Sequence, residues 1–151
     1  MRVRLTVLGA VLLAAGCGGS SPKSSKPALP PPPPPPAPPA TASAGAVKAT
    51  LVAPTHNPKI NAKWRYTVKV TDRGGRPLSG KLTVQIVDPL GTAHAVQYDD
   101  TKQNITRRPF RGTFRDYAEF PADARGFRLT FRVIAATSKG KVSLTYPVTP
   151  R

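Results

Sequence analysis

The chain of 151 residues has a single cysteine, two histidines and only seven acidic residues. A lone cysteine excludes an intramolecular disulfide, and it excludes zinc or iron–sulfur sites built from several cysteines of one chain. The two histidines, His56 and His94, are not spaced as HxH or HxxxH, so no metal site is expected. We expect His56 to be a turn residue and His94 to be exposed on an edge strand.

The sequence also lacks the arrangements that carry catalysis. No Gly-x-Ser-x-Gly, phosphate-binding loop or catalytic cysteine is present. Asp99 and Asp100 are adjacent, and neighbouring side chains on a strand point to opposite faces, which disfavours joint acid–base chemistry. Ser79 and Lys81 resemble a Ser–Lys pair, but they flank a glycine in a tight turn. We therefore predict no catalytic residue, no metal and no cofactor, and hence a protein that is not an enzyme.

The scarcity of acidic residues leaves a large positive charge of +16. Setting aside Arg2, Arg4, Lys23 and Lys26, which precede residue 47, leaves 19 basic against 7 acidic side chains, or +12, in residues 47–151. Such an excess favours anionic partners by long-range attraction: lipid headgroups, phosphate-bearing wall polymers or nucleic acid. The excess of basic side chains is explained equally well if they merely keep the domain soluble.

The N-terminus has the three-part layout of a secretory signal. Two arginines within residues 1–4 precede an apolar run of 11 residues, 5–15, and small residues then lead to Cys17. As a helix this run covers about 17 Å, well short of the ~30 Å hydrocarbon core of a bilayer. We predict a signal peptide over residues 1–16 and no permanent spanning helix.

The segment Ala14-Ala15-Gly16-Cys17 resembles the bacterial lipobox, although Ala14 stands where leucine is commonest. The resemblance implies lipidation of Cys17, cleavage before it, and a protein held on the extracytoplasmic face of a membrane. Several acyl chains on one residue give stable anchoring. Without lipidation, ordinary cleavage would release a soluble secreted protein.

Residues 17–46 are predicted to form a disordered, Pro-rich linker. Seven consecutive prolines occupy residues 30–36. Proline favours the polyproline II conformation, a semi-rigid rod that rises ~3.1 Å per residue. We interpret the segment as a spacer. A ligand for proline-recognising domains is the alternative, and it is disfavoured because those domains are mainly intracellular.

From residue 47 onward, apolar residues recur with a period of two, and no stretch of eight residues has a helical period. Clear alternation covers 64–71, 81–86, 127–133 and 141–146, with Phe127 taken as the first inward residue of its strand; weaker strands are expected near 48–53, 93–98 and 110–117. About seven short strands over 105 residues, 47–151, predict an all-β fold, an immunoglobulin-like antiparallel β-sandwich. A small barrel is the alternative.

Residues 64–84 resemble bacterial immunoglobulin-like modules. In those modules a strand ending in Val-x-Asp leads through Gly-x-Pro-Leu-x-Gly into the next strand; here Val70-Thr71-Asp72 precedes Gly75-Arg76-Pro77-Leu78-Ser79-Gly80. The glycines permit a positive φ in the turn and the proline restricts entry to the next strand. The resemblance implies the sandwich and says nothing about activity.

Arginines interleaved with aromatic residues make the candidate binding surface. The candidates for contact with an anionic partner are Arg107, Arg108, Arg111, Arg115, Arg128, Arg132 and Lys141. Arginine can grip phosphate groups. A solvated face over a core of Phe and Tyr explains the same pattern, and on the sequence alone it is the preferred interpretation. The aromatic residues alternate inward, so no specific nucleic-acid binding is expected.

Together these features predict a membrane-anchored lipoprotein of the cell envelope. Its basic domain is expected to be a binding or structural module that meets an anionic wall polymer or a partner protein of the envelope. The alternative is an accessory or substrate-binding subunit of an envelope enzyme or transporter.

Overall fold

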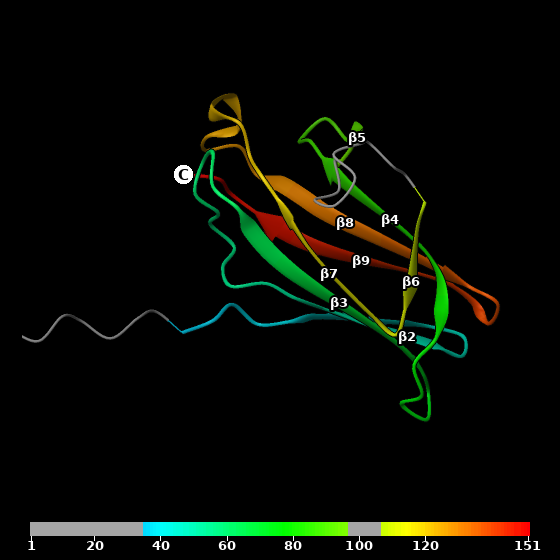
Figure 1. Ribbon diagram of the computed structural model, residues 1–151. Coiled ribbons are helices and arrows are strands. Elements are labelled where there is room, and N and C mark those ends of the chain that lie inside the picture. The colour runs from blue at the N-terminus through cyan, green and yellow to red at the C-terminus, as the bar shows by residue number, and fades with distance from the viewer. Residues whose placement is uncertain (1–34, 97–106) are drawn as a thin grey trace, which may run out of the picture. The chain divides into compact units, whose positions relative to one another are not determined.

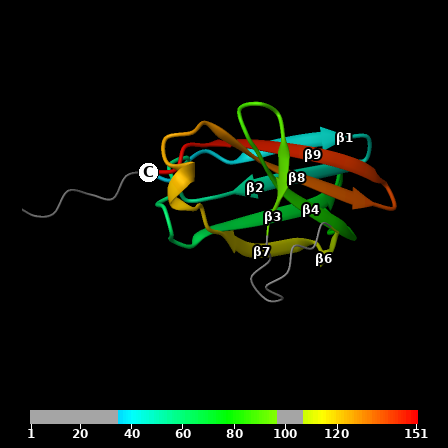
Figure 2. The same cartoon turned by 90° about the horizontal axis from the view of Figure 1, so that it is seen from above.

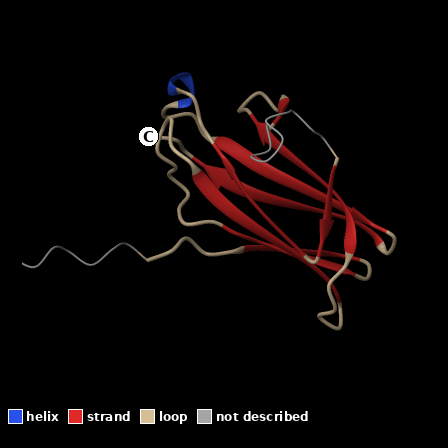
Figure 3. Ribbon diagram, in the orientation of Figure 1, coloured by secondary structure: helices blue, strands red, loops and turns tan. Residues whose placement is uncertain are grey.

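The computed structural model describes residues 35–96 and 107–151. In these residues the chain forms nine β-strands and one short 3-10 turn, η1 (Ala122–Ala124) (Figure 3). The strands are β1 (Ala40–Ala44), β2 (Val47–Val52), β3 (Trp64–Asp72), β4 (Ser79–Val87), β5 (Ala93–Ala95), β6 (Arg108–Arg111), β7 (Thr113–Ala118), β8 (Leu129–Thr137) and β9 (Gly140–Val148).

The strands form two antiparallel sheets that pack face to face (Figure 1). Sheet one has the order β1-β2-β3-β7, and sheet two has the order β6-β4-β8-β9, with β5 pairing on β4 beyond β6. The prediction of an all-β antiparallel sandwich is confirmed. Six strands occupy the positions of an immunoglobulin-like layout: β2, β3 and β7 on one sheet and β4, β8 and β9 on the other.

The two sheets meet at both edges. At one edge β6 continues into β7 through Gly112, whose φ is +67° and whose neighbours Arg111 and Thr113 are paired (Figure 2). At the other edge β9 lies beside β1 and β2 (Figure 2). The core is therefore closed on both sides.

Alternation in each strand directs one set of side chains into this core. Trp64 packs among aromatic residues of the core, with ring centroids 5.0 Å from Phe131, 5.8 Å from Phe120 and 5.9 Å from Tyr146. The Trp64 Nε1–H donates to the carbonyl oxygen of Thr55 at 2.9 Å, so the one polar atom of the indole is satisfied.

The strands expected from clear alternation are present, and the weaker one near 48–53 is β2. The segment 110–117 is not one strand: Gly112 divides it into β6 and β7. Of the segment 93–98, residues 93–95 form β5, and residues 97 and 98 lie outside the described residues. The strand expected at 127–133 begins at Leu129.

Two further predictions need correction. Phe127 is not an inward residue: it is 54 % exposed and lies in the turn before β8, because Gly126 with φ of +78° turns the chain there. Strand β1 was not expected, and it places the start of the sheet seven residues before the predicted domain boundary at residue 47. Its sequence, Ala-Thr-Ala-Ser-Ala, alternates only in small side chains, so its hydropathy pattern is weak. Residues 17–34 of the predicted linker lie outside the described residues.

Candidate anion-binding surface

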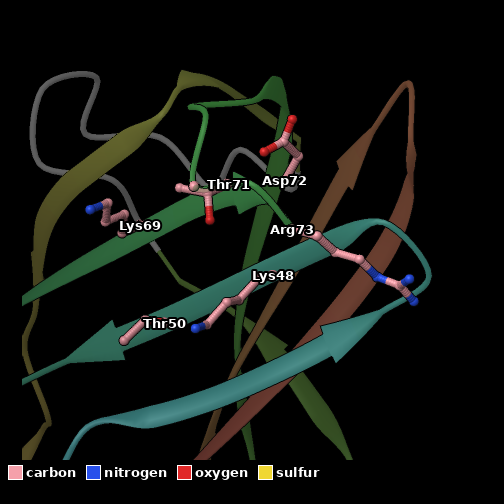
Figure 4. A pocket seen from close by; sticks show the side chains of 7 residues that line it. Lys48, Thr50, Lys69, Thr71, Asp72 and Arg73 are labelled. Carbon is pink, nitrogen blue, oxygen red and sulfur yellow. The ribbon is translucent and has the colours of Figure 1, made fainter.

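The outer face of sheet one has a hollow of about 220 Å³ over β2 and β3 (Figure 4). It is lined by Lys48, Thr50, Lys69, Thr71, Asp72, Arg73 and Gly75. The hollow lies toward the turns at 45–46 and 73–78, at the end of the sandwich opposite to residue 35 and Arg151 (Figure 1).

Two lysines and two threonines face each other across the strand pair that floors the hollow. Lys48 is opposite Thr71, and Thr50 is opposite Lys69. Directly opposite residues have Cβ atoms about 5 Å apart, and the next outward pair lies about 7 Å along the strands. Each lysine side chain therefore leaves the sheet opposite one threonine and next to another.

Thr71 is the one buried polar residue of the described chain, at 8 % exposure. Figure 4 shows its hydroxyl oxygen on the side that faces β2. No side-chain hydrogen bond of Thr71 occurs within the described residues. The hydroxyl is thus available to a group placed in the hollow.

The single carboxylate that lines the hollow is already engaged. Asp72 Oδ2 lies 3.1 Å from Lys139 Nζ, and Asp72 Oδ1 accepts the backbone N–H groups of Gly74 and Arg76, each at 3.0 Å. The hydrogen bond from Lys139, together with those backbone bonds, lowers the pKa of Asp72 below its usual value. Asp72 therefore stays ionised and paired, and it does not neutralise Lys48 or Lys69.

Among the described residues, neither Lys48 nor Lys69 has a carboxylate within 4.0 Å. Arg73 is turned away, because its Nε–H donates to the carbonyl oxygen of Gly45 at 3.0 Å in the β1–β2 turn (Figure 4). The hollow consequently presents two exposed ammonium groups beside free hydroxyl groups, a combination of donors suited to an anion.

The structure does not gather the seven predicted binding residues on one surface, and three of them lie on the outer faces of the two sheets. Arg115 lies on the outer face of sheet one, where it is exposed. Arg132 and Lys141 lie on the outer face of sheet two, on β8 and β9. Arg111 is at the edge, opposite Ser79. The remaining three are Arg107 and Arg128, both exposed outside the strands, and Arg108, which is partly buried in β6.

On sheet two, Lys141 is opposite Ala136 of β8, and Ala136 is opposite Lys81 of β4, so the two lysines share one row. Arg132 is held by its cross-strand neighbour, because its Nε–H and Nη2–H both donate to Gln85 Oε1, at 3.1 and 2.8 Å. This arginine is thus oriented by a neutral amide and keeps its charge.

Lys48 and Lys69 supply the free ammonium groups of the hollow, and neither is among the binding residues predicted from the sequence. Alternation alone places each on an outward position beside threonines. Their juxtaposition depends on β2 pairing with β3, and the 11-residue loop between these strands (53–63) gives no sequence signal for that register.

Both histidines have structural contacts. His56 Nδ1–H donates to the carbonyl oxygen of Pro147 at 2.7 Å, and the His56 ring stacks on Tyr146 with centroids 4.1 Å apart. His94 lies on β5, its side chain 58 % exposed, with Nε2 3.1 Å from Asp88 Oδ2. That hydrogen bond from His94, with backbone N–H bonds, lowers the pKa of Asp88. The prediction for each histidine is confirmed.

Over the ranges that the structure describes, no three His, Cys, Asp or Glu residues come close enough to hold a metal ion. Those ranges also contain no helix with the length and hydropathy needed to cross a bilayer. Comparison of the chain with protein-family models, with curated proteins and with solved structures finds no match.

Proposed function

We propose that the protein is a lipid-anchored lipoprotein of the cell envelope, whose basic immunoglobulin-like domain binds an anionic envelope polymer. The observation that carries this proposal is the hollow on sheet one, where Lys48 and Lys69 have no carboxylate partner while the nearby Asp72 is paired with Lys139. Unpaired ammonium groups on a rigid sheet attract polyanions at long range and contact them at short range.

The position of the hollow supports presentation away from an anchor. Cys17 precedes the Pro-rich segment, and the described chain begins at residue 35, at the end of the sandwich opposite to the hollow (Figure 1). If the domain is tethered to the membrane through that end, the hollow points away from the membrane. We place the protein on the extracytoplasmic face of its membrane on the strength of the signal-like N-terminus.

Binding to polymers of different charge tests the proposal. The full chain, purified in mild detergent, is titrated with synthetic poly(glycerol phosphate), with polygalacturonate and with neutral dextran, at ~20 and ~300 mM salt; the Debye length falls from about 20 Å to about 6 Å over this range. Binding to at least one anionic polymer, weakened at high salt, is expected, and no binding to dextran. Failure to bind either anionic polymer at low salt would overturn the binding function.

The anchor is tested separately through Cys17. The mature protein isolated from a bacterial host should partition into detergent and carry the mass of a lipid on its N-terminal residue, whereas the Cys17→Ser variant should partition into water. A wild-type protein that lacks lipid would overturn the anchor and leave the binding function to its own test.

A further inference from the structure

The outer face of sheet one has one basic residue in each of four successive rows of outward side chains. The rows follow from the strand registers: Lys48 with Thr71, then Lys69 with Thr50 and Thr113, then Arg115 with Val52 and Thr67, then Arg65 with Tyr117. All four basic side chains are exposed, and these rows contain no acidic residue. We call Lys48, Lys69, Arg115 and Arg65 the basic stripe.

The basic stripe runs obliquely across three strands. Lys48 is on β2, Lys69 on β3 and Arg115 on β7, each one row further along the sheet than the last, and Arg65 returns to β3. Rows are about 7 Å apart and strands about 5 Å apart, so successive members lie about 8 Å from each other at the backbone. This spacing suits a linear polymer that carries one negative charge in each repeat.

The hollow at the start of the basic stripe indicates the type of charge. Lys48 and Lys69 offer ammonium donors, and Thr50 and Thr71 offer hydroxyl donors, along the lining of the same hollow. A phosphate group is tetrahedral and accepts hydrogen bonds on several oxygens, whereas a carboxylate is planar and has two; the fork of an arginine can pair with either group, and lysine binds phosphate as a point charge. Arg73, the arginine at the hollow, is directed to Gly45 instead.

We propose that a phosphodiester polymer lies along the basic stripe with one phosphate seated in the hollow between Lys48 and Lys69. This inference rests on the proposed function and names the ligand class and the face that binds it. Sheet two, whose outer face also carries basic residues, is not the binding face.

The surroundings of the basic stripe favour a polymer over a bilayer or a nucleic acid. Val52, 48 % exposed, is the one large apolar side chain in these rows that is exposed, so there is little to insert among acyl chains. Base stacking needs open aromatic faces, and the aromatic ring in these rows, Tyr117, has Lys63 Nζ 4.2 Å from its centroid. A polymer of phosphates joined by small polyols needs neither feature.

Two double variants with equal charge change test the assignment. K48Q/K69Q removes the lysines of the hollow, and K81Q/K141Q removes two exposed lysines that share a row on the outer face of sheet two. Affinity for synthetic poly(glycerol phosphate) is measured with the full chain in mild detergent over a salt series, and thermal midpoints check that each variant is folded. The single variant T71V removes the hydroxyl at the floor and keeps the shape of the side chain.

We expect K48Q/K69Q to lose at least about 20-fold in affinity at low salt. The plot of log K against log salt should also become less steep by about 1.4, because each of the two lost phosphate contacts accounts for about 0.7 of its slope. K81Q/K141Q should lose less than about 3-fold, since its charges lie on the opposite face and act only through screened long-range attraction. T71V should lose about 3- to 10-fold in affinity, the equivalent of one hydrogen bond of ordinary net strength.

Other outcomes overturn the inference in distinguishable ways. Equal losses in the two double variants would remove the hollow as the site while leaving polyanion binding intact. Tighter binding to polygalacturonate than to poly(glycerol phosphate) would remove phosphate as the ligand. Tighter binding to vesicles of phosphatidylglycerol, with the same dependence on Lys48 and Lys69, would assign the hollow to a membrane headgroup. Absence of binding to every anionic probe would overturn the proposed function as well.

Discussion

Lys139 Nζ lies 3.1 Å from Asp72 Oδ2, and this ion pair joins the β8–β9 turn of sheet two to the last residue of β3 in sheet one. The same carboxylate holds the β3–β4 turn through the N–H groups of Gly74 and Arg76. Asp72 thus connects both sheets beside the hollow, and its charge is satisfied without Lys48 or Lys69.

The stability of the domain should fall with acid partly because of Asp72. The pKa of Asp72 is lower in the folded protein than in the unfolded chain, where it is about 3.9. Its contribution to the free energy of unfolding is therefore complete above about pH 3.9 and is lost as pH falls through the lower pKa of the folded state. In D72N the amide oxygen can still accept the turn N–H groups while the ion pair is gone. Urea unfolding between pH 2 and 7 should show a shallower acid slope for D72N than for wild type, with the slope due to Asp88 remaining. An unchanged slope would contradict the ion pair.

Removal of Lys139 should weaken anion binding without touching the hollow. In K139M the carboxylate of Asp72 loses its partner and lies unbalanced next to Lys48 and Lys69. We expect the affinity for poly(glycerol phosphate) to fall about 3- to 5-fold, because one unbalanced negative charge near the protein surface repels the polymer. The double variant D72N/K139M should recover most of it, since the unpaired charge is then absent. Failure of the second substitution to restore affinity would show that Lys139 itself contacts the polymer.

Gly80 should tolerate no side chain. A Cβ on this residue would collide with the carbonyl oxygen of Ala136, the neighbour of its cross-strand partner Thr137 on β8. G80A should therefore lower the free energy of unfolding by about 3 kcal/mol through forced displacement of β4 from β8. Gly74 is the matched control, because a Cβ there meets Asp72 Oδ1 at an ordinary 3.4 Å. G74A should cost less than about 1 kcal/mol in the same urea titration.

The motif around Gly80 illustrates how far the sequence could predict this fold. Alternation located the buried faces of β3, β4, β8 and β9, because each strand is amphipathic and long enough for its period to be read. The positive φ expected in the turn occurs at Gly75, at +80°. Gly80 is required for a different reason, close approach of β8, which depends on a strand some fifty residues later and leaves no local signal.

The candidate site was less predictable for the same reason. Arginines close together in sequence, such as Arg111 and Arg115, are separated by the bend at Gly112 and belong to different sheets. Lys48 and Lys69 are 21 residues apart and become neighbours only through the β2–β3 register. Local clustering of charge therefore does not show which cationic side chains share a face, because strand pairing determines that.

Trp64 should be a sensitive position for stability and a direct reporter of folding. The W64F variant loses the hydrogen bond to Thr55, leaves that carbonyl oxygen without its partner, and opens space beside Phe131 and Phe120. We expect a loss of about 2 to 3 kcal/mol in the free energy of unfolding. The exposed Phe127 is the control, since F127A should change stability by less than about 0.5 kcal/mol. Circular dichroism in urea measures both, and a large effect of F127A would contradict its exposed position.

Tyr146 should govern the alkaline limit of the fold. Its hydroxyl is buried and has no hydrogen-bond partner within the described residues, and burial raises the pKa of this phenol above 10. Near pH 10 the Tyr146 phenol is then ionised to a greater extent in the unfolded chain than in the folded one. The free energy of unfolding therefore falls as pH rises from about 10 toward the folded pKa. In Y146F the ring at this position can still stack on His56, and the buried hydroxyl group of Tyr146 is removed. The variant should be as stable as wild type or up to about 1 kcal/mol more stable at pH 7. It should also lose less stability between pH 9 and 11, measured by urea unfolding at each pH. A variant clearly less stable than wild type at pH 7 would mean that the hydroxyl makes a stabilising contact in solution.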